Sequence, residues 1–113
     1  MSDIEQTVFI VDDEEALRES LRWLLESIRL RIETFDSAEA FLSNYAPDRA
    51  GCLVLDVRMP GTSGPELMDL LNRIGAPIPI IFLSAHGDVP LTVRAMKGGA
   101  FDFLQKPYNN QEF

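Results

Sequence analysis

Carboxylates gather near the start of the chain, where the apolar run VFIV is followed directly by DDEE over residues 12–15. Like charges this close repel and raise one another's pKa, so the cluster costs folding free energy unless a cation or a helix end offsets it. Two readings are open at this point. Asp12 or Asp13 could cap a helix that starts near Glu14, or the carboxylates could hold a metal ion.

Three further polar residues follow apolar runs in the same way. Asp56 comes after CLVL, Ser84 after IIFL and Lys106 after FDFLQ. Taken singly, these residues are ordinary as a turn residue, a loop cap and a surface charge. Their repeated position at the end of an apolar run favours a shared site instead.

The elements that would position these residues can be predicted from hydrophobic periodicity. Short apolar runs predict strands, and segments of helical period lie between them. The expected strands are 7–11, 31–35, 52–56, 80–83 and 101–104. One expected helix has an apolar face made by Leu17, Leu21, Leu24, Leu25 and Ile28, and another has a face made by Leu67, Leu70, Leu71 and Ile74.

The remaining helices are predicted from their start and stop signals. Ser37 can cap a helix over AEAFLSNYA, whereas Asp88 with Pro90 opens a helix that Gly98 and Gly99 close. Strands and helices therefore alternate from the first strand to the last. Continuously apolar strands joined by helices predict a doubly wound α/β domain with a parallel sheet covered on both faces.

Ligands of such sheets bind beyond the carboxyl ends of the strands. A crowded set of carboxylates there suits a hard cation such as Mg²⁺, which keeps several waters and bridges carboxylates to a phosphoryl oxygen. With the charge neutralised, one carboxylate could attack phosphorus and form an aspartyl phosphate. An ammonium and a hydroxyl donor would then stabilise the transferred group.

Composition excludes several other classes of protein. The chain has 113 residues, enough for one domain with its own core, and a net charge of −8 that disfavours nucleic acid and anionic membranes as direct partners. Cys52 is the only cysteine, so neither a disulfide nor a cysteine zinc site is expected, and a small buried side chain is the expected role. No signal peptide or long apolar run is visible, which predicts a cytoplasmic protein.

Four stretches, IVDDEEALRESL, LVLDVRMPGTSG, IIFLSAHGD and FDFLQKP, resemble the motifs of response-regulator receiver domains. The resemblance covers residues 7–112. It implies a flavodoxin-like, five-stranded parallel sheet of order 2-1-3-4-5. It also implies that 1–113 is one receiver domain whose final helix is largely missing, with an output domain outside this chain.

The resemblance assigns roles to the acidic residues. Asp56 is the expected phosphoacceptor. Asp12 and Asp13 are the expected acids of a site for Mg²⁺, or Mn²⁺, to which Asp56 and the backbone carbonyl of Arg58 add ligands.

The same resemblance assigns the remaining site residues. Ser84 is expected to bond a phosphoryl oxygen and Lys106 to pair with it, and the peptide bond from Lys106 to Pro107 is expected to be cis. Phe103 stands at the usual aromatic switch position, where it would act together with Ser84. His86 could contact the phosphate, although an exposed loop residue is the commoner case.

The stretch from Ser84 to Pro107 is most similar to receivers of the FixJ type. This similarity implies a sensor histidine kinase as phosphoryl donor, a linked DNA-binding output domain, and a homodimer that forms on phosphorylation. Such a domain promotes its own phosphorylation and dephosphorylation but serves as a signalling switch.

Three other functions compete with this interpretation. The main alternative is a Mg²⁺-dependent phosphatase that acts on a small molecule through an aspartyl phosphate, but such enzymes typically carry a second acid where this chain has Arg58. A flavin- or nucleotide-binding module would have to place phosphate beside the acidic turn. A receiver that only binds partners would not need the complete set of acids, hydroxyl and lysine.

Overall fold

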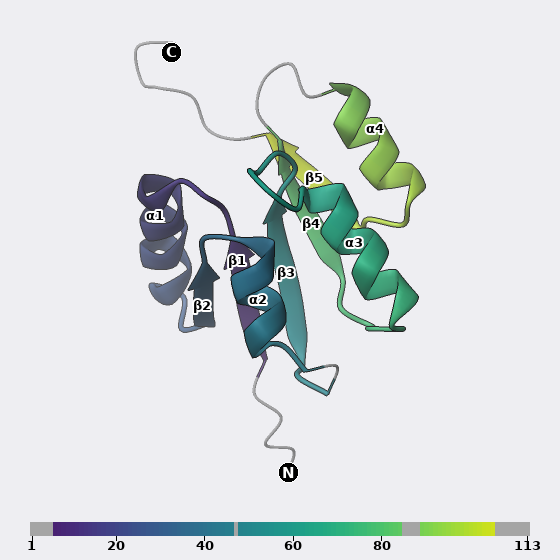
Figure 1. Cartoon of the computed structure of the whole chain (residues 1–113). Coiled ribbons are helices and arrows are strands. Elements are labelled where there is room, and N and C mark those ends of the chain that lie inside the picture. The colour runs from purple at the N-terminus through teal and green to yellow at the C-terminus, as the bar shows by residue number, and fades with distance from the viewer. Residues whose placement is uncertain (1–5, 47, 85–88, 106–113) are drawn as a thin grey trace, which may run out of the picture.

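The computed structural model describes residues 6–46, 48–84 and 89–105, and within them strands and helices alternate as predicted (Figure 1). The elements are β1 (Thr7–Val11), α1 (Glu15–Glu26), β2 (Arg31–Phe35), α2 (Ala38–Asn44), β3 (Gly51–Asp56), α3 (Gly64–Arg73), β4 (Ile80–Ser84), α4 (Val89–Lys97) and β5 (Asp102–Gln105). No helix in these ranges is long and apolar enough to cross a membrane.

The strands form one five-stranded parallel sheet in the order β2-β1-β3-β4-β5. Both the fold class and the strand order predicted from the sequence are confirmed. The central strand β3 lies between β1 and β4, so residues that follow β1, β3 and β4 emerge at one edge of the sheet.

The core lies between the sheet and helices α2, α3 and α4, which cover the face toward the viewer in Figure 1. Phe9, Leu55 and Phe82 point from the strands into this layer, and all three are fully buried. Phe41 of α2 meets the ring of Phe9 edge-on, with the ring centroids 5.5 Å apart. Burying each side chain of this size contributes about 1.5–3 kcal/mol, which makes this layer the main source of stability.

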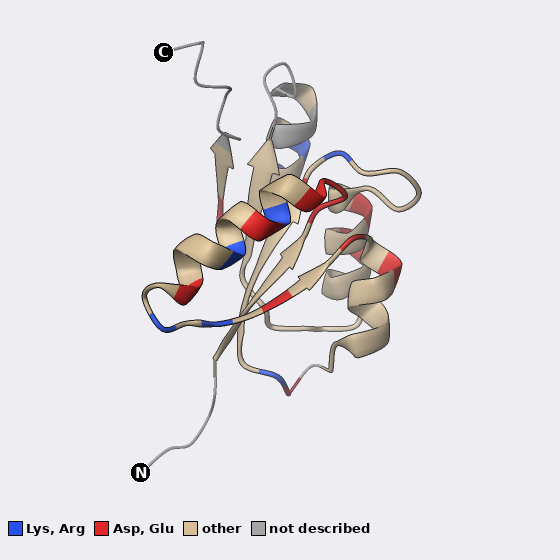
Figure 2. Cartoon of the chain, turned by 90° about the vertical axis from the view of Figure 1, so that its left-hand side faces the viewer, with Lys and Arg blue, Asp and Glu red and all other residues tan. Residues whose placement is uncertain are grey.

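Helix α1 lies on the other side of the sheet from α2 (Figure 2). The sequence predicts an apolar face for this helix, but none of the residues of α1 is fully buried. Leu24 is 57% exposed, and Ile28, just beyond the end of the helix, is 63% exposed. The expectation of a sheet covered on both faces is therefore only partly met on this side within the described residues, where Leu17, Leu21 and Leu25 are partly buried. The physical reason is that α1 rests on the edge strand β2, with no other described helix beside it on that side of the sheet. Trp23 of the same helix is 77% exposed.

The predicted start and stop signals of α2 and α4 are confirmed where the structure describes them. The side chain of Ser37 caps α2 by accepting a hydrogen bond from the N–H of Ala40 at 3.0 Å. Helix α4 ends at Lys97, and Gly99 follows with a φ of 108°, a conformation that favours glycine. Asp88, the other predicted start signal of α4, lies outside the described residues.

Candidate functional site

The register of the sheet brings the predicted site residues to one edge. Val11 pairs with Leu55, so the residues that follow them, Asp12 and Asp56, leave neighbouring strands at the same level. Asp56 in turn pairs with Leu83, which places Ser84 one residue further along β4. The sequence prediction that these residues meet at the carboxyl edge of the sheet agrees with this geometry.

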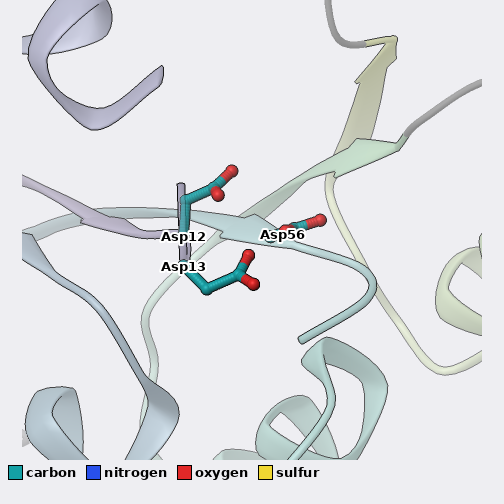
Figure 3. A group of neighbouring side chains, drawn as sticks. All are labelled: Asp12, Asp13 and Asp56. Atoms are coloured by element: carbon teal, nitrogen blue, oxygen red, sulfur yellow. The ribbon is translucent and has the colours of Figure 1, made fainter. Parts of the chain in front are cut away.

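Asp12, Asp13 and Asp56 form a compact group of carboxylates (Figure 3). Each offers one oxygen atom, and these oxygens lie within 4.8 Å of one another. Asp12 is fully buried and Asp56 is 2% exposed, whereas Asp13 is exposed to solvent. Negative groups packed this closely, with two of them shielded from water, fit a hard divalent cation with oxygen ligands such as Mg²⁺.

The acidic turn is held by backbone hydrogen bonds to Asp12. Its N–H donates to the carbonyl oxygen of Phe35 at the end of β2, at 3.1 Å. Its carboxylate oxygen Oδ1 accepts the N–H of Glu14 at 2.8 Å. The N-cap of α1 is Glu14, whose side chain makes no capping hydrogen bond, so the alternative in which Asp12 or Asp13 is the cap is wrong. Asp12 orders the turn ahead of the helix.

Asp56 is fixed from the other side by the loop that follows β3. The N–H of Arg58 donates to Asp56 Oδ1 at 3.2 Å. Gly64 begins α3 close by, and a Cβ at this position would lie 2.3 Å from the backbone carbonyl oxygen of Asp56. Only glycine permits this approach, which brings the start of α3 against the strand that carries Asp56.

The remaining predicted residues differ in how far the structure places them. Ser84 is 5% exposed at the end of β4, where it pairs with Gln105 of β5. Phe103 pairs with Phe82 but is itself 42% exposed at the edge strand. The predicted lysine, the predicted cis peptide bond and the loop histidine fall on Lys106, Pro107 and His86, which lie outside the described residues.

One contact beside the site was not predicted from the sequence. The hydroxyl of Thr62, in the loop between Asp56 and α3, donates to Glu39 Oε2 of α2 at 2.7 Å. This hydrogen bond is the main reason why the pKa of Glu39 lies below its usual value. Residues 39 and 62 share no periodic pattern, so only the fold reveals that α2 is tied to the loop that follows Asp56.

A second contact that sequence reasoning missed involves Arg18 of α1. Its Nη1 donates to the backbone carbonyl oxygen of Asp12 at 2.8 Å. An arginine soon after an acidic turn is a weak signal, because most such arginines on a helix are solvated.

Comparison with known proteins gives a consistent result. The model of the response regulator receiver domain matches residues 8–113. The transcriptional regulatory protein TdiR of Thauera aromatica is 55% identical over 106 residues, which cover 94% of this chain and 47% of TdiR. The transcriptional regulatory protein FixJ of Azorhizobium caulinodans is 52% identical over 103 residues, covering 91% of this chain and 49% of FixJ.

Solved structures support the same grouping. The crystal structure of FixJ-N is similar with a TM-score of 0.84 and 48% identity, over 99% of this chain and 88% of that chain. The response regulator StyR gives a TM-score of 0.85 at 55% identity, over 96% of this chain and 55% of that chain. The chain spans about half the length of the curated relatives it matches.

Proposed function

Because the chain belongs to the response-regulator receiver domain family, we propose that it is a phosphoacceptor switch in which Asp56 takes a phosphoryl group from a histidine kinase. The observation that carries this proposal is the carboxylate group itself. Asp56 is buried beside Asp12 and Asp13, with their oxygens within 4.8 Å, at the edge where Ser84 also ends its strand.

In the proposed reaction a carboxylate oxygen of Asp56 attacks the phosphorus of the donor. A new P–O bond forms, the bond from phosphorus to the donor's imidazole nitrogen breaks, and the electron pair of that bond leaves with the nitrogen. Asp12, Asp13, Asp56 and the carbonyl oxygen of Arg58 would hold Mg²⁺, or Mn²⁺, which when bound neutralises charge on the phosphoryl oxygens. The N–H of Arg58, which donates to Asp56 Oδ1, keeps the carboxylate oriented.

Ser84 and Lys106 complete the proposed set. The hydroxyl of Ser84 would donate to a phosphoryl oxygen, and the ammonium of Lys106 would offset the negative charge of that group. Burial of Ser84 at the adjacent strand end supports the first assignment. The second rests on sequence, because Lys106 directly follows Gln105, the β5 partner of Ser84.

The proposed output is transcriptional and lies outside this domain. TdiR and FixJ are transcriptional regulators about twice the length of the matching region. The net charge of −8 supports a division of labour in which this domain receives the signal and a second domain contacts DNA.

The phosphatase alternative gains no support from the site. Arg58 is exposed at the position where such enzymes carry a second acid, and it contacts Asp56 through its backbone. In the part of the chain that the structure describes, no inserted segment covers the strand ends to enclose a small substrate.

The proposal is tested by incubating the protein with acetyl phosphate and Mg²⁺ and measuring its intact mass. The wild type is expected to gain one phosphoryl group, and Asp56→Asn none, because the amide cannot act as the nucleophile. Asp36→Asn is the matched control, since Asp36 follows β2 at the same edge of the sheet and is exposed. Labelling of Asp56→Asn at the wild-type rate would refute the assignment.

A further inference from the structure

Arg18 links helix α1 to the acidic turn through a single directed contact. Its Nη1 donates to the backbone carbonyl oxygen of Asp12 at 2.8 Å, across six residues of chain. The side chain is partly buried, and the backbone N–H of Arg18 is in turn bonded to the carbonyl of Glu14 at 3.1 Å. The guanidinium thus reaches back over the first turn of the helix to the residue that precedes it.

This contact is one of three hydrogen bonds that hold different groups of Asp12. Its N–H is bound by Phe35 of β2, and its carboxylate by the N–H of Glu14. The carbonyl is bound by Arg18, so strand, turn and helix each hold a different group of the same residue. Since Asp13 is the next residue, the orientation of the Asp12 carbonyl also sets the peptide plane from which Asp13 extends.

The positive charge of Arg18 and its hydrogen bond to Asp12 would have opposite effects on metal binding. A guanidinium bound to the backbone of a proposed metal ligand repels a divalent cation, so a purely electrostatic effect of Arg18 would weaken metal binding. A positioning effect would strengthen it, because ligands held in place in the free protein lose less freedom when the metal binds. The two effects therefore predict opposite signs for the removal of Arg18.

We propose that Arg18 is a positioning residue that holds the Asp12–Asp13 turn in the arrangement required for metal binding, without contacting the metal or the phosphoryl group. This inference rests on the proposed metal site. Substituting groups that orient metal ligands typically weakens affinity by about 10–100-fold. Because Arg18 acts through a backbone carbonyl and is only partly buried, we expect Arg18→Met to raise the Kd for Mg²⁺ by about 3–10-fold.

The test is a titration with Mg²⁺ alone, followed through the amide chemical shifts of residues 12–14 and 56–58. Arg22→Met is the matched control, because Arg22 lies one turn further along α1 and forms an exposed ion pair with Glu26 at 3.2 Å. A higher Kd for Mg²⁺ in Arg18→Met, with the Kd of Arg22→Met equal to that of the wild type, supports the inference. Unchanged or tighter binding by Arg18→Met overturns it while leaving the proposed site intact, whereas absence of binding by the wild type overturns both.

Amide hydrogen exchange in metal-free protein provides a second readout. The N–H of Glu14 is expected to exchange faster in Arg18→Met, while the N–H of Thr7, bonded to Ala50 at the far end of β1, stays at its wild-type rate. Equal protection of Glu14 in both proteins would contradict a positioning role. If Arg18→Met loses its cooperative urea transition, Arg18→Lys replaces it under the same criteria, since lysine keeps the charge but not the planar fork.

Discussion

The two adjacent aspartates that follow β1 differ in burial and in hydrogen bonding. Asp12 is fully buried and accepts a hydrogen bond from the N–H of Glu14, whereas Asp13 is exposed. Neither residue is the N-cap of α1. Asp12 therefore contributes to the fold as well as to the proposed site. Asp13 mainly adds negative charge beside Asp12 and Asp56.

This difference predicts distinct outcomes for the two alanine substitutions. Asp13→Ala is expected to abolish Mg²⁺ binding and phosphorylation while leaving metal-free stability within about 0.5 kcal/mol of wild type or above it, because one of three crowded charges is removed. Asp12→Ala is expected to lose about 1 kcal/mol through the missing bond to Glu14, offset in part by the same relief of repulsion.

Urea denaturation in the presence of a chelator measures both effects. A clear loss of stability in Asp13→Ala would mean that its carboxylate supports the helix after all.

At the residue scale, the side chains of the candidate site were easier to predict from the sequence than the hydrogen bonds that hold them in place. Asp12, Asp13, Asp56 and Ser84 were predicted because each follows an apolar run, and parallel strands bring such positions together. The contact from Arg18 could not be predicted, since it depends on the path of the chain between β1 and α1.

At the scale of elements, β2 is joined to the loop that precedes β3 by an ion pair between Glu33 and Arg49. Arg49 forms a two-pronged contact with Glu33, including a bond from Nη1 to Oε1 of 3.0 Å. The same guanidinium lies 4.8 Å from the ring centroid of Phe9 and donates to the carbonyl of Asn44. Arg49 therefore links β2 to the loop that enters β3, on the side of the sheet where the strands begin, away from the carboxylates.

The Arg49 hydrogen bond holds the pKa of Glu33 below its ordinary value, which predicts a pH-dependent contribution to stability. For a carboxyl group with a lowered pKa, this contribution is present above the unfolded-state pKa and is lost as the pH falls through the folded-state pKa. Glu33→Gln should therefore cost about 1 kcal/mol at neutral pH, since the pair is only partly shielded, and progressively less in acid.

Urea midpoints measured at several pH values test this, with Glu26→Gln as the control. Glu26 pairs with Arg22 in the open, so its substitution should change stability by less than about 0.5 kcal/mol at any pH. A difference between Glu33→Gln and wild type that stays constant into the acid range would contradict the linkage.

The elements themselves were predicted from sequence with unequal success. The expected strands agree with the observed ones to within one residue at each end, because buried parallel strands leave an unbroken apolar signal. The apolar face of α1 was also visible, but its exposure was not. Periodicity shows which side of a helix is apolar, and only the packed structure shows what covers that side.

For the whole molecule, the two faces of the sheet are unequally covered. Phe9, Leu55 and Phe82 are fully buried on one face, whereas Cys52 and Val54 on the other are partly exposed, and burial raises the pKa of the Cys52 thiol. Within the residues that the structure describes, helix α1 is the one helix on this second face, which is therefore the less fully covered of the two.

Exposed apolar residues on α4 and β5 suggest where two copies would meet. Val93 and Met96 of α4 are 47% and 38% exposed, and Phe103 of β5 is 42% exposed. Drawing the Ser84 hydroxyl toward a phosphoryl group would leave space that Phe103 could enter, which would change this surface. We expect beryllofluoride with Mg²⁺ to shift the protein from monomer toward a two-fold dimer.

Sedimentation velocity with and without beryllofluoride tests the dimer in the wild type and in Ser84→Ala. The variant should dimerise less, because it lacks the hydroxyl that would respond to the phosphoryl mimic. Equal dimerisation of both proteins would show that the change does not depend on Ser84.

The strand order also governs when the carboxylates can first meet during synthesis. β1 lies between β2 and β3, so its first neighbour in the sheet emerges from the ribosome early, and its second emerges only after α2. Pairings between distant segments form slowly because the intervening loop must first be closed. A nascent chain that ends within α2 therefore carries Asp12 and Asp13 without Asp56, and the three carboxylates cannot come together until β3 has left the exit tunnel.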